Sequence, residues 1–239
     1  MGGSGIAGYW LFLAAQLKTV PGYLLAILCA LLLAACSSAL RWHPDYHTVR
    51  SGETLYSIAM QYNLDQRQLA GWNRLGSGTY IRAGQKLRLT PPSGYTTAKS
   101  KDGKAKPSAS SVVDLPAPAW HWPTSGAVLL YFGESPKTQS GIRIAGTEGQ
   151  SVKATAAGEV VYAGTGLRSY GQLLILKHNE TWLSAYGFNS KLLVTEGGRV
   201  QAGQVIAAMG RDSGGRALLH FEIRRNGQPV DPLRYLPPH

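Results

Sequence analysis

The sequence predicts two folded domains of different classes: a small α+β domain with a βααβ order, joined by a flexible linker to an all-β domain. In residues 45–90, an apolar stripe at helical spacing lies between two short strand patterns. In residues 120–239, short apolar runs alternate with Gly-rich turns at roughly ten-residue spacing. Residues 91–119 are rich in Pro, Ser, Lys and Ala, a composition typical of a flexible, disordered linker.

The N-terminus predicts an export signal rather than a part of the fold. Residues 23–35 form an apolar run shorter than the roughly twenty residues of a membrane-spanning helix. The run ends in Leu-Ala-Ala before Cys36, which resembles a bacterial lipobox and implies a lipid-modified Cys36. A signal anchor with an incidental cysteine is the alternative. We expect a signal peptide at 1–35 and a lipid-anchored tether at 36–44.

The charge balance limits the classes of partner. The chain has 24 Lys and Arg against 13 Asp and Glu, a formal net charge of +11, and basic proteins suit anionic partners. Behind an export signal these are the carboxylates of peptidoglycan, anionic lipid or an acidic protein, whereas nucleic acid is not expected. Cys29 falls within the signal and Cys36 is assigned to lipid, so we expect no disulfide.

The elements of the first domain follow in order along residues 45–90. A strand pattern at 47–50 leads through the turn Ser51-Gly52 to Thr54, which can cap a helix. Asp65 can cap a second helix that ends at Asn73, and a closing strand follows at 86–89. The first helix carries an apolar stripe at i, i+3, i+4 and i+7: Leu55, Ile58, Ala59 and Tyr62.

This unit resembles the LysM domain, which binds glycans that contain N-acetylglucosamine, such as peptidoglycan. The matching motifs are Tyr46-His47-Thr48-Val49, Ser51-Gly52-Glu53-Thr54-Leu55, Asn73, and Ile81 with Gly84-Gln85-Lys86-Leu87. By motif position, the resemblance implies a peptidoglycan-binding groove formed by Gly52, Glu53, Thr54, Leu55, Tyr80, Ile81 and Arg82. The alternative is that Leu55 and Ile81 are core residues and that Gly52 only makes a turn.

The second domain reads as a series of short strands. Apolar runs bounded by glycine predict strands at 126–131, 158–164, 173–178 and 205–210. Asn226-Gly227 predicts a tight hairpin turn between strands on either side. Residues 120–239 thus have the pattern of an all-β domain.

This domain resembles the zinc peptidases of the lysostaphin/LytM type. The matching motifs include Gly141-Ile142-Arg143-Ile144-Ala145-Gly146, Tyr170-Gly171-Gln172-Leu173, Ser184-Ala185-Tyr186 and Leu219-His220-Phe221-Glu222. Active members of that family carry His-x-x-x-Asp and His-x-His, which supply zinc ligands and catalytic groups. Here His220 is retained, and four other residues replace the family's zinc-binding or catalytic ones: Gln139, Arg143, Phe188 and Leu218.

These replacements predict a domain without zinc or catalysis. A protein zinc site needs about three ligands drawn from His, Asp, Glu or Cys, and the permanent charge of Arg143 repels a cation. We therefore expect no metal, no cofactor and no enzymatic activity. No serine or cysteine nucleophile signature appears either. If the scaffold is kept, a partner groove would be lined by Arg143, Tyr170, Tyr186, Phe188 and His220, although the two tyrosines could simply pack the domain.

The combination resembles outer-membrane lipoproteins of the NlpD and ActS (YgeR) kind, which join a LysM domain to a degenerate LytM domain. The resemblance implies a pseudoenzyme on the periplasmic face of the outer membrane of a Gram-negative cell. It implies peptidoglycan binding and activation of periplasmic zinc amidases in cell division or cell-wall organisation. One alternative is a wall-tethering scaffold that recruits other envelope proteins, and another is a residual zinc endopeptidase.

Overall fold

The computed structural model describes residues 44–76, 80–92, 114–135 and 139–238. The expected signal peptide, the expected lipidation site Cys36 and most of the expected linker lie outside these ranges. Residues Pro44–His239 belong to one compact unit. In the described part of the chain, no helix combines the length and the apolar character needed to cross a bilayer.

The N-terminal domain has the expected βααβ order. Its two strands pair antiparallel, with His47 opposite Leu87. Its elements are β1 (Tyr46–Thr48), α3 (Leu55–Gln61), α4 (Gln66–Trp72) and β2 (Lys86–Arg88). Apolar side chains from both helices and both strands form its core: Val49, Leu55, Ile58, Ala59, Leu69, Leu87 and Leu89.

Both helices begin at the residues that the sequence predicts as caps. The Thr54 hydroxyl accepts a hydrogen bond from the Ser57 N–H at 3.2 Å, and Ser57 Oγ accepts one from the Thr54 N–H at 3.0 Å. Asp65 Oδ1 accepts the N–H groups of Arg67 and Gln68 at 2.9 and 3.1 Å. Each cap satisfies donors that the first helical turn leaves without a partner.

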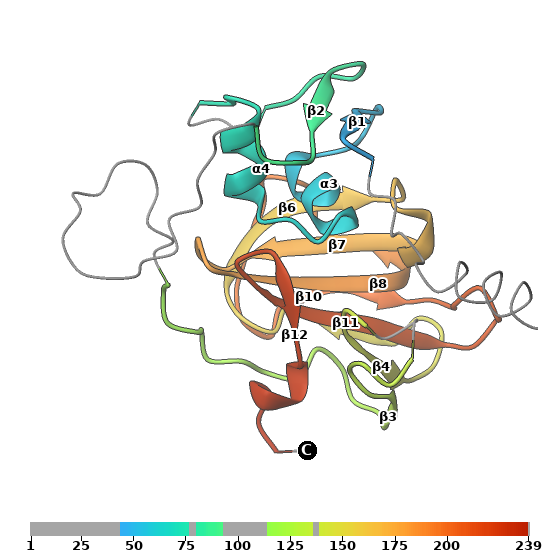
Figure 1. The fold of residues 1–239 in the computed structure, drawn as a ribbon. Coiled ribbons are helices and arrows are strands. Elements are labelled where there is room, and N and C mark those ends of the chain that lie inside the picture. Colours follow the sequence, from blue (N-terminus) through green and yellow to red (C-terminus); the bar gives the residue numbers. More distant parts are fainter. Residues whose placement is uncertain (1–43, 77–79, 93–113, 136–138, 239) are drawn as a thin grey trace, which may run out of the picture. The chain divides into compact units, whose positions relative to one another are not determined.

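The C-terminal domain is built on antiparallel strands that join in one sheet. The order along the main path is β3-β4-β11-β8-β7-β6-β9, while β10 pairs with β5 and β8, and β12 pairs with β11 (Figure 1). The strands are β3 (Val128–Leu130), β4 (Ile142–Ala145), β5 (Ser151–Lys153), β6 (Gly158–Gly164), β7 (Gln172–Lys177), β8 (Trp182–Leu192), β9 (Arg199–Val200), β10 (Val205–Met209), β11 (Leu218–Arg225) and β12 (Gln228–Val230). The all-β prediction is therefore confirmed.

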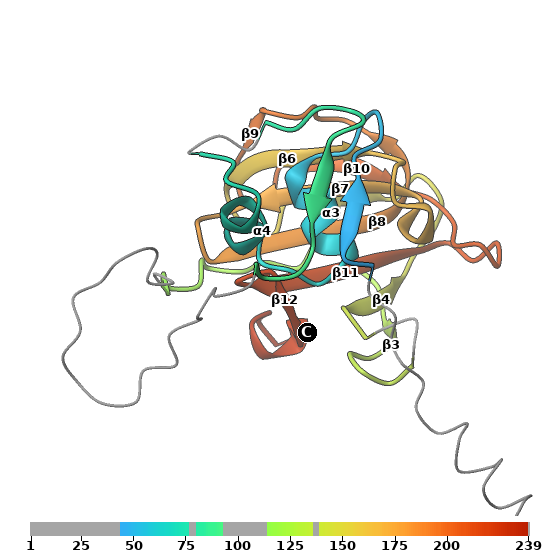
Figure 2. The same ribbon diagram turned by 45° about the horizontal axis from the view of Figure 1, so that its top comes forward.

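The turns and edges of this domain follow the sequence signals. Asn226 and Gly227 both have positive φ, 50° and 75°, as the tight turn between β11 and β12 requires. Two short 3₁₀ turns complete the domain, η2 (Arg168–Tyr170) and η3 (Pro232–Arg234). The C-terminal segment that contains η3 follows β12 (Figure 2).

Strand β8 changes partner along its length. Its first part, through Gly187, pairs with β11, and its last part, from Asn189, pairs with β10. Phe188 lies at this change and has φ +62°, a conformation that is rare for a bulky side chain. The strand thereby joins the main sheet to the β10–β5 pair, and backbone strain is concentrated at Phe188.

The two domains contact each other within the compact unit. Met60 of α3 belongs to one apolar cluster with Tyr162, Leu173 and Ile175 of the sheet. Arg224 of β11, fully buried, donates to the Asn63 side-chain oxygen at 3.2 Å. The sequence pattern of two domains joined by a linker does not indicate this contact.

Candidate functional site

Alternation along β11 divides its side chains between two faces. Leu219, Phe221 and Ile223 enter the main apolar core, so Leu218, His220, Glu222 and Arg224 lie on the opposite face. The register places His220 directly opposite Arg143 of β4 and opposite Gly187 of β8. Gly141, immediately before β4, permits this approach, because a Cβ there would lie 2.3 Å from the Phe221 carbonyl oxygen.

Four of the residues expected to line the groove come together at this point, and we call them the Arg143 cluster: Arg143, Tyr170, Phe188 and His220. The Arg143 guanidinium carbon lies 5.2 Å from the Phe188 ring centre. The His220 ring lies 5.4 Å from that of Tyr170 and 6.2 Å from that of Phe188. The strained backbone of Phe188 thus carries its ring to the arginine and the histidine.

Tyr186, the fifth expected member, is elsewhere, and that expectation is wrong. Its ring is fully buried and packs against Phe221 in the core. Its hydroxyl accepts the Thr155 N–H at 2.9 Å. Because Tyr186 directly opposes Phe221 across the strands, it shares the core face of the sheet. Burial raises the pKa of its hydroxyl, so it stays protonated.

Arg143 makes a buried ion pair within the chain. Its Nη1 lies 3.3 Å from Asp212 Oδ2, and both side chains are less than a tenth exposed. Burial lowers the pKa of Arg143, and the Asp212 carboxylate offsets this in part. Burial works against ionisation of Asp212, but the Arg216 and Gly214 N–H groups outweigh it and lower the pKa of that carboxyl. No local sequence pattern indicates this pair, because its two residues are 69 positions apart.

A second polar network extends along β11 from His220. Glu222 accepts from His220 Nε2 at 2.8 Å and from Arg224 Nε at 2.7 Å. Burial alone would raise the pKa of Glu222, but the charge of Arg224 and the His220 hydrogen bond lower it to about 2. Glu222 is therefore a carboxylate at neutral pH. Burial, and then the charge of Glu222, raise the pKa of Tyr170.

The retained residues do not fit a zinc ion. At the positions that the resemblance assigns to zinc binding or catalysis, His220 supplies one nitrogen, Leu218 is fully buried and apolar, and Arg143 is a cation. Gln139 is exposed in a turn before β4. Among the described residues, no three side chains of His, Cys, Asp and Glu form a group that could hold a metal. The Arg143 guanidinium, a permanent cation, lies opposite His220 in the strand register.

The expected glycan groove brings two loops of the N-terminal domain together. The Val49 N–H donates to the Gln85 carbonyl and the Gly84 N–H to the Val49 carbonyl, each at 2.8 Å, so the turn at Gly52 lies beside the loop that contains Tyr80 and Arg82. Tyr80 is 94% exposed, and Gly52 and Arg82 are exposed as well. Thr54 and Ile81 are half-buried, Thr54 as the cap of α3 and Ile81 against the core.

Two of the expected glycan-binding side chains have other roles. Leu55 is fully buried in the core, as the alternative interpretation proposed. The Glu53 carboxylate is 3% exposed and accepts from His47 Nε2 and from the Arg50 N–H, both at 2.7 Å. Their side chains cannot reach a surface ligand in this conformation, so we correct both assignments to structural ones. Gly52, Tyr80 and Arg82 remain as exposed candidates.

Two family models match the chain, LysM domain over residues 47–90 and Peptidase family M23 over residues 137–232. The lipoprotein NlpD/LppB homolog of Pseudomonas aeruginosa is 39% identical over 89% of this chain and 90% of its own length. The uncharacterized lipoprotein YgeR of Escherichia coli is 36% identical over 92% of this chain and 94% of its own length. The murein hydrolase activator NlpD of Escherichia coli is 53% identical over 51% of this chain and 32% of its own length.

The fold and the matches define a protein that carries a LysM domain followed by an M23 peptidase-type domain. The chain belongs to the family of LysM–M23 lipoproteins that includes NlpD and YgeR.

Proposed function

We propose that this protein is a lipid-anchored, peptidoglycan-binding activator of the periplasmic N-acetylmuramoyl-L-alanine amidases, and is not itself an enzyme. It would be held at the periplasmic face of the outer membrane through Cys36 and would act in cell separation or wall remodelling. The observation that carries the proposal is the Arg143 cluster, in which the guanidinium pairs with Asp212. The resemblance to active M23 members implies that this position would otherwise hold a metal ligand.

The chemistry of the cluster favours binding over hydrolysis. One histidine and a permanent cation cannot hold a zinc-bound water, which M23-type hydrolysis requires. Arginine and aromatic side chains are, in contrast, the residues enriched at interface hot spots. Relatives with the name murein hydrolase activator support an activating role. The LysM match supports peptidoglycan as the second partner.

Dye release from labelled sacculi tests the proposal. The full mature chain should release little dye alone and should increase release by at least one purified amidase from the same cell. Binding of an amidase without increased release would favour the scaffold alternative. Release by this protein alone, with cleaved peptide cross-links among the products, would favour a residual endopeptidase.

Elemental analysis tests the metal prediction separately. The purified chain should contain no stoichiometric zinc, and about one zinc per chain would overturn the pseudoenzyme assignment. The double substitution Gln139→His and Arg143→Asp should recover some zinc binding, because it restores two ligands beside His220. Hydrolysis would also need Leu218→His, and Phe188→His as well if that position supplies the general base.

A further inference from the structure

The Arg143 cluster is closed and leaves two buried polar atoms without partners. Arg143 is 7% exposed and His220 is 3% exposed. Arg143 Nε and His220 Nδ1 make no hydrogen bond within the described residues. Folded proteins pair the great majority of such atoms, because a buried donor or acceptor without a partner is destabilising. The closed arrangement therefore holds unused hydrogen-bonding capacity at the residues that the proposed function assigns to the partner.

The loop between β10 and β11 is fastened to this cluster by one carboxylate. Asp212 Oδ1 accepts the Gly214 N–H at 2.9 Å and the Arg216 N–H at 3.0 Å, which fixes the shape of its own loop. Its Oδ2 contacts Arg143 Nη1 at 3.3 Å and Arg216 Nη2 at 3.4 Å. The same side chain thus shapes the loop and joins it to Arg143.

The contact between Asp212 and Arg143 uses only part of the guanidinium. One long contact through Nη1 leaves Nε–H unpaired. A carboxylate that approached the guanidinium edge could bind Nε and a terminal nitrogen together, the geometry in which Arg–carboxylate pairs are strongest. Asp212 is therefore a weaker partner for Arg143 than an external carboxylate in the bidentate position would be.

Release of Asp212 from Arg143 would not leave the aspartate without partners. It keeps the two backbone donors of its own loop and the side chain of Arg216, which is 58% exposed and moves with that loop. Removal of one partner from a buried ion pair is costly mainly because the other charge stays buried and unpaired. Here Arg216 remains paired with Asp212, and the incoming carboxylate replaces Asp212 as the partner of Arg143.

We propose that Asp212 is a latch that holds the 210–217 loop closed over Arg143. An acidic side chain on a segment of the partner amidase would release this latch by binding Nε and a terminal nitrogen of Arg143 together. This inference rests on the proposed function and adds the regulation of the same site. The partner chemistry is a carboxylate, presented by a segment that also covers the Phe188 ring. The latch keeps the binding residues covered until that segment arrives.

The substitution Asp212→Asn tests the latch in the full mature chain without any partner. Asparagine keeps an acceptor for the loop N–H groups but loses the charge that holds Arg143. Hydrogen exchange of the 210–217 amides should rise about tenfold or more, and labelling of Arg143 by phenylglyoxal should accelerate. Unchanged exchange and unchanged labelling would overturn the latch.

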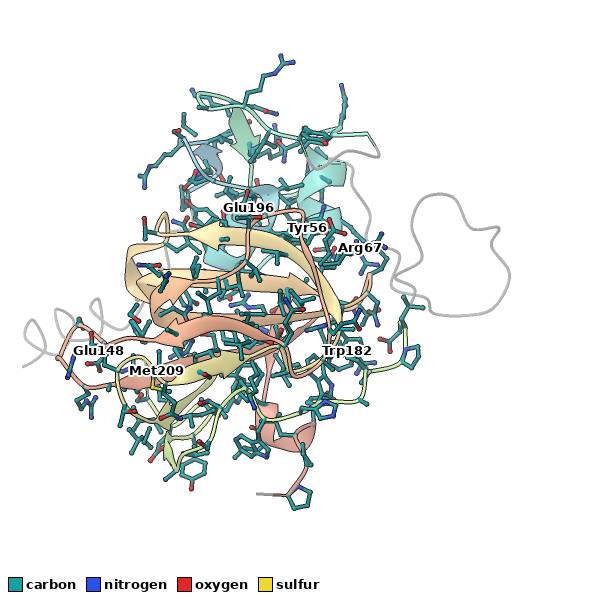
Figure 3. The ribbon with its side chains drawn as sticks, turned by 180° about the vertical axis from the view of Figure 1, so that it is seen from behind. Tyr56, Arg67, Glu148, Trp182, Glu196 and Met209 are labelled. Carbon is teal, nitrogen blue, oxygen red and sulfur yellow. The ribbon has the colours of Figure 1, made fainter. Side chains whose placement is uncertain are left out.

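A matched control lies beside the same loop. Glu148→Gln breaks the Arg211–Glu148 ion pair, in which each side chain is 54% exposed, near Met209 at the end of the sheet far from Trp182 (Figure 3). Exposed pairs contribute little to stability, so this variant should leave exchange and labelling unchanged. Equal effects of the two substitutions would mean that any change at the loop opens it, which contradicts a specific latch.

Amidase stimulation then separates the latch from the proposed function. Asp212→Asn should lower the concentration of this protein that gives half-maximal dye release by about threefold or more. Arg143→Lys should also raise loop exchange but should lose stimulation, because lysine cannot present the planar fork. A raised half-maximal concentration for Asp212→Asn would overturn the latch. Exchange and labelling could rise in Asp212→Asn although neither the wild type nor the variant stimulates any amidase. In that case the proposed function fails, but the Asp212 latch on the 210–217 loop stands.

Discussion

A buried histidine–carboxylate pair occurs in each domain, and the two pairs differ in one respect. In the LysM domain His47 Nε2 lies 2.7 Å from Glu53, and in the M23 domain His220 Nε2 lies 2.8 Å from Glu222. All four side chains are nearly inaccessible to solvent. The two pairs have the same chemistry and nearly the same distance, but they differ in the surroundings of the other histidine nitrogen, Nδ1.

In the LysM domain both ring nitrogens of the histidine have partners. His47 Nδ1 is hydrogen-bonded to the Tyr62 hydroxyl at 3.0 Å, and Glu53 also accepts the Arg50 N–H. In the M23 domain His220 Nδ1 has no partner among the described residues. The first pair holds a loop in shape, whereas His220 Nδ1 of the second pair leaves a hydrogen-bonding position unused beside Arg143. Under the proposed function, this is the face that meets the partner.

The largest effect should come from breaking the M23 network at its centre. Glu222→Leu leaves Arg224 buried without its carboxylate, which costs about 3–5 kcal/mol for pairs of this kind. The free energy of unfolding, measured by urea denaturation, should fall by about 3 kcal/mol. Glu180→Gln at the exposed Lys177–Glu180 pair is the control and should change it by less than about 0.5 kcal/mol. A loss below about 1 kcal/mol for Glu222→Leu would contradict the role of the network.

The next effect concerns the binding residues themselves. Phe188→Ala should weaken binding to the amidase by about 2 kcal/mol, or roughly thirtyfold in affinity, because a buried aromatic anchor is lost. Amidase stimulation should fall accordingly. Arg143→Glu should abolish stimulation because it reverses the charge offered to the partner carboxylate. The measurement is dye release from sacculi, with circular dichroism to check folding. Lys191→Ala should have little effect, and full stimulation by both cluster variants would place the interface elsewhere.

In the LysM domain, the comparison predicts that one substitution weakens peptidoglycan binding and that another lowers stability. Tyr80→Ala removes an exposed ring and should reduce sacculus binding severalfold, a loss of about 1 kcal/mol, without changing stability. Glu53→Gln should lower the stability of the domain, because it weakens the hydrogen bonds from His47 and Arg50 that hold the turn at Gly52. Co-sedimentation with insoluble peptidoglycan measures the first effect and thermal unfolding the second. Deletion of residues 45–90 should remove sacculus binding, and binding without them would refute the LysM assignment.

The smallest effect is a pH dependence that a third histidine sets. Burial lowers the pKa of His178 from 6.5 to about 4. The folded state then binds this proton less readily than the unfolded state does. Stability is therefore complete above about pH 6.5 and is lost as the pH falls toward 4, by about 1 kcal/mol at pH 5.5. His178→Gln should flatten the unfolding free energy between pH 7.5 and 5.5, measured by urea denaturation, and an unchanged slope would exclude His178 as the cause.

Much of the fold is readable from local sequence patterns. Capping residues at Thr54 and Asp65 and the Asn226-Gly227 turn act within a few residues, so the sequence states them directly. The face on which Tyr186 lies was not readable, because a motif gives strand positions but not the register that decides the face. The Arg143–Asp212 pair spans 69 residues and forms only when the strands are assembled. The motif positions predicted that Arg143, Tyr170, Phe188 and His220 lie together, but not that Asp212 pairs with Arg143 there.

The end of the M23 domain packs back against its beginning. The Trp122 indole donates to the Pro237 carbonyl at 2.9 Å, the Tyr235 ring lies 4.9 Å from that of Trp182, and Leu236 is buried. A protease that needs an extended C-terminal segment must first unfold the turn at Pro232–Arg234 and detach these side chains. Proteolysis within residues 232–238 should therefore depend on how often this segment detaches rather than on the presence of a cleavage sequence.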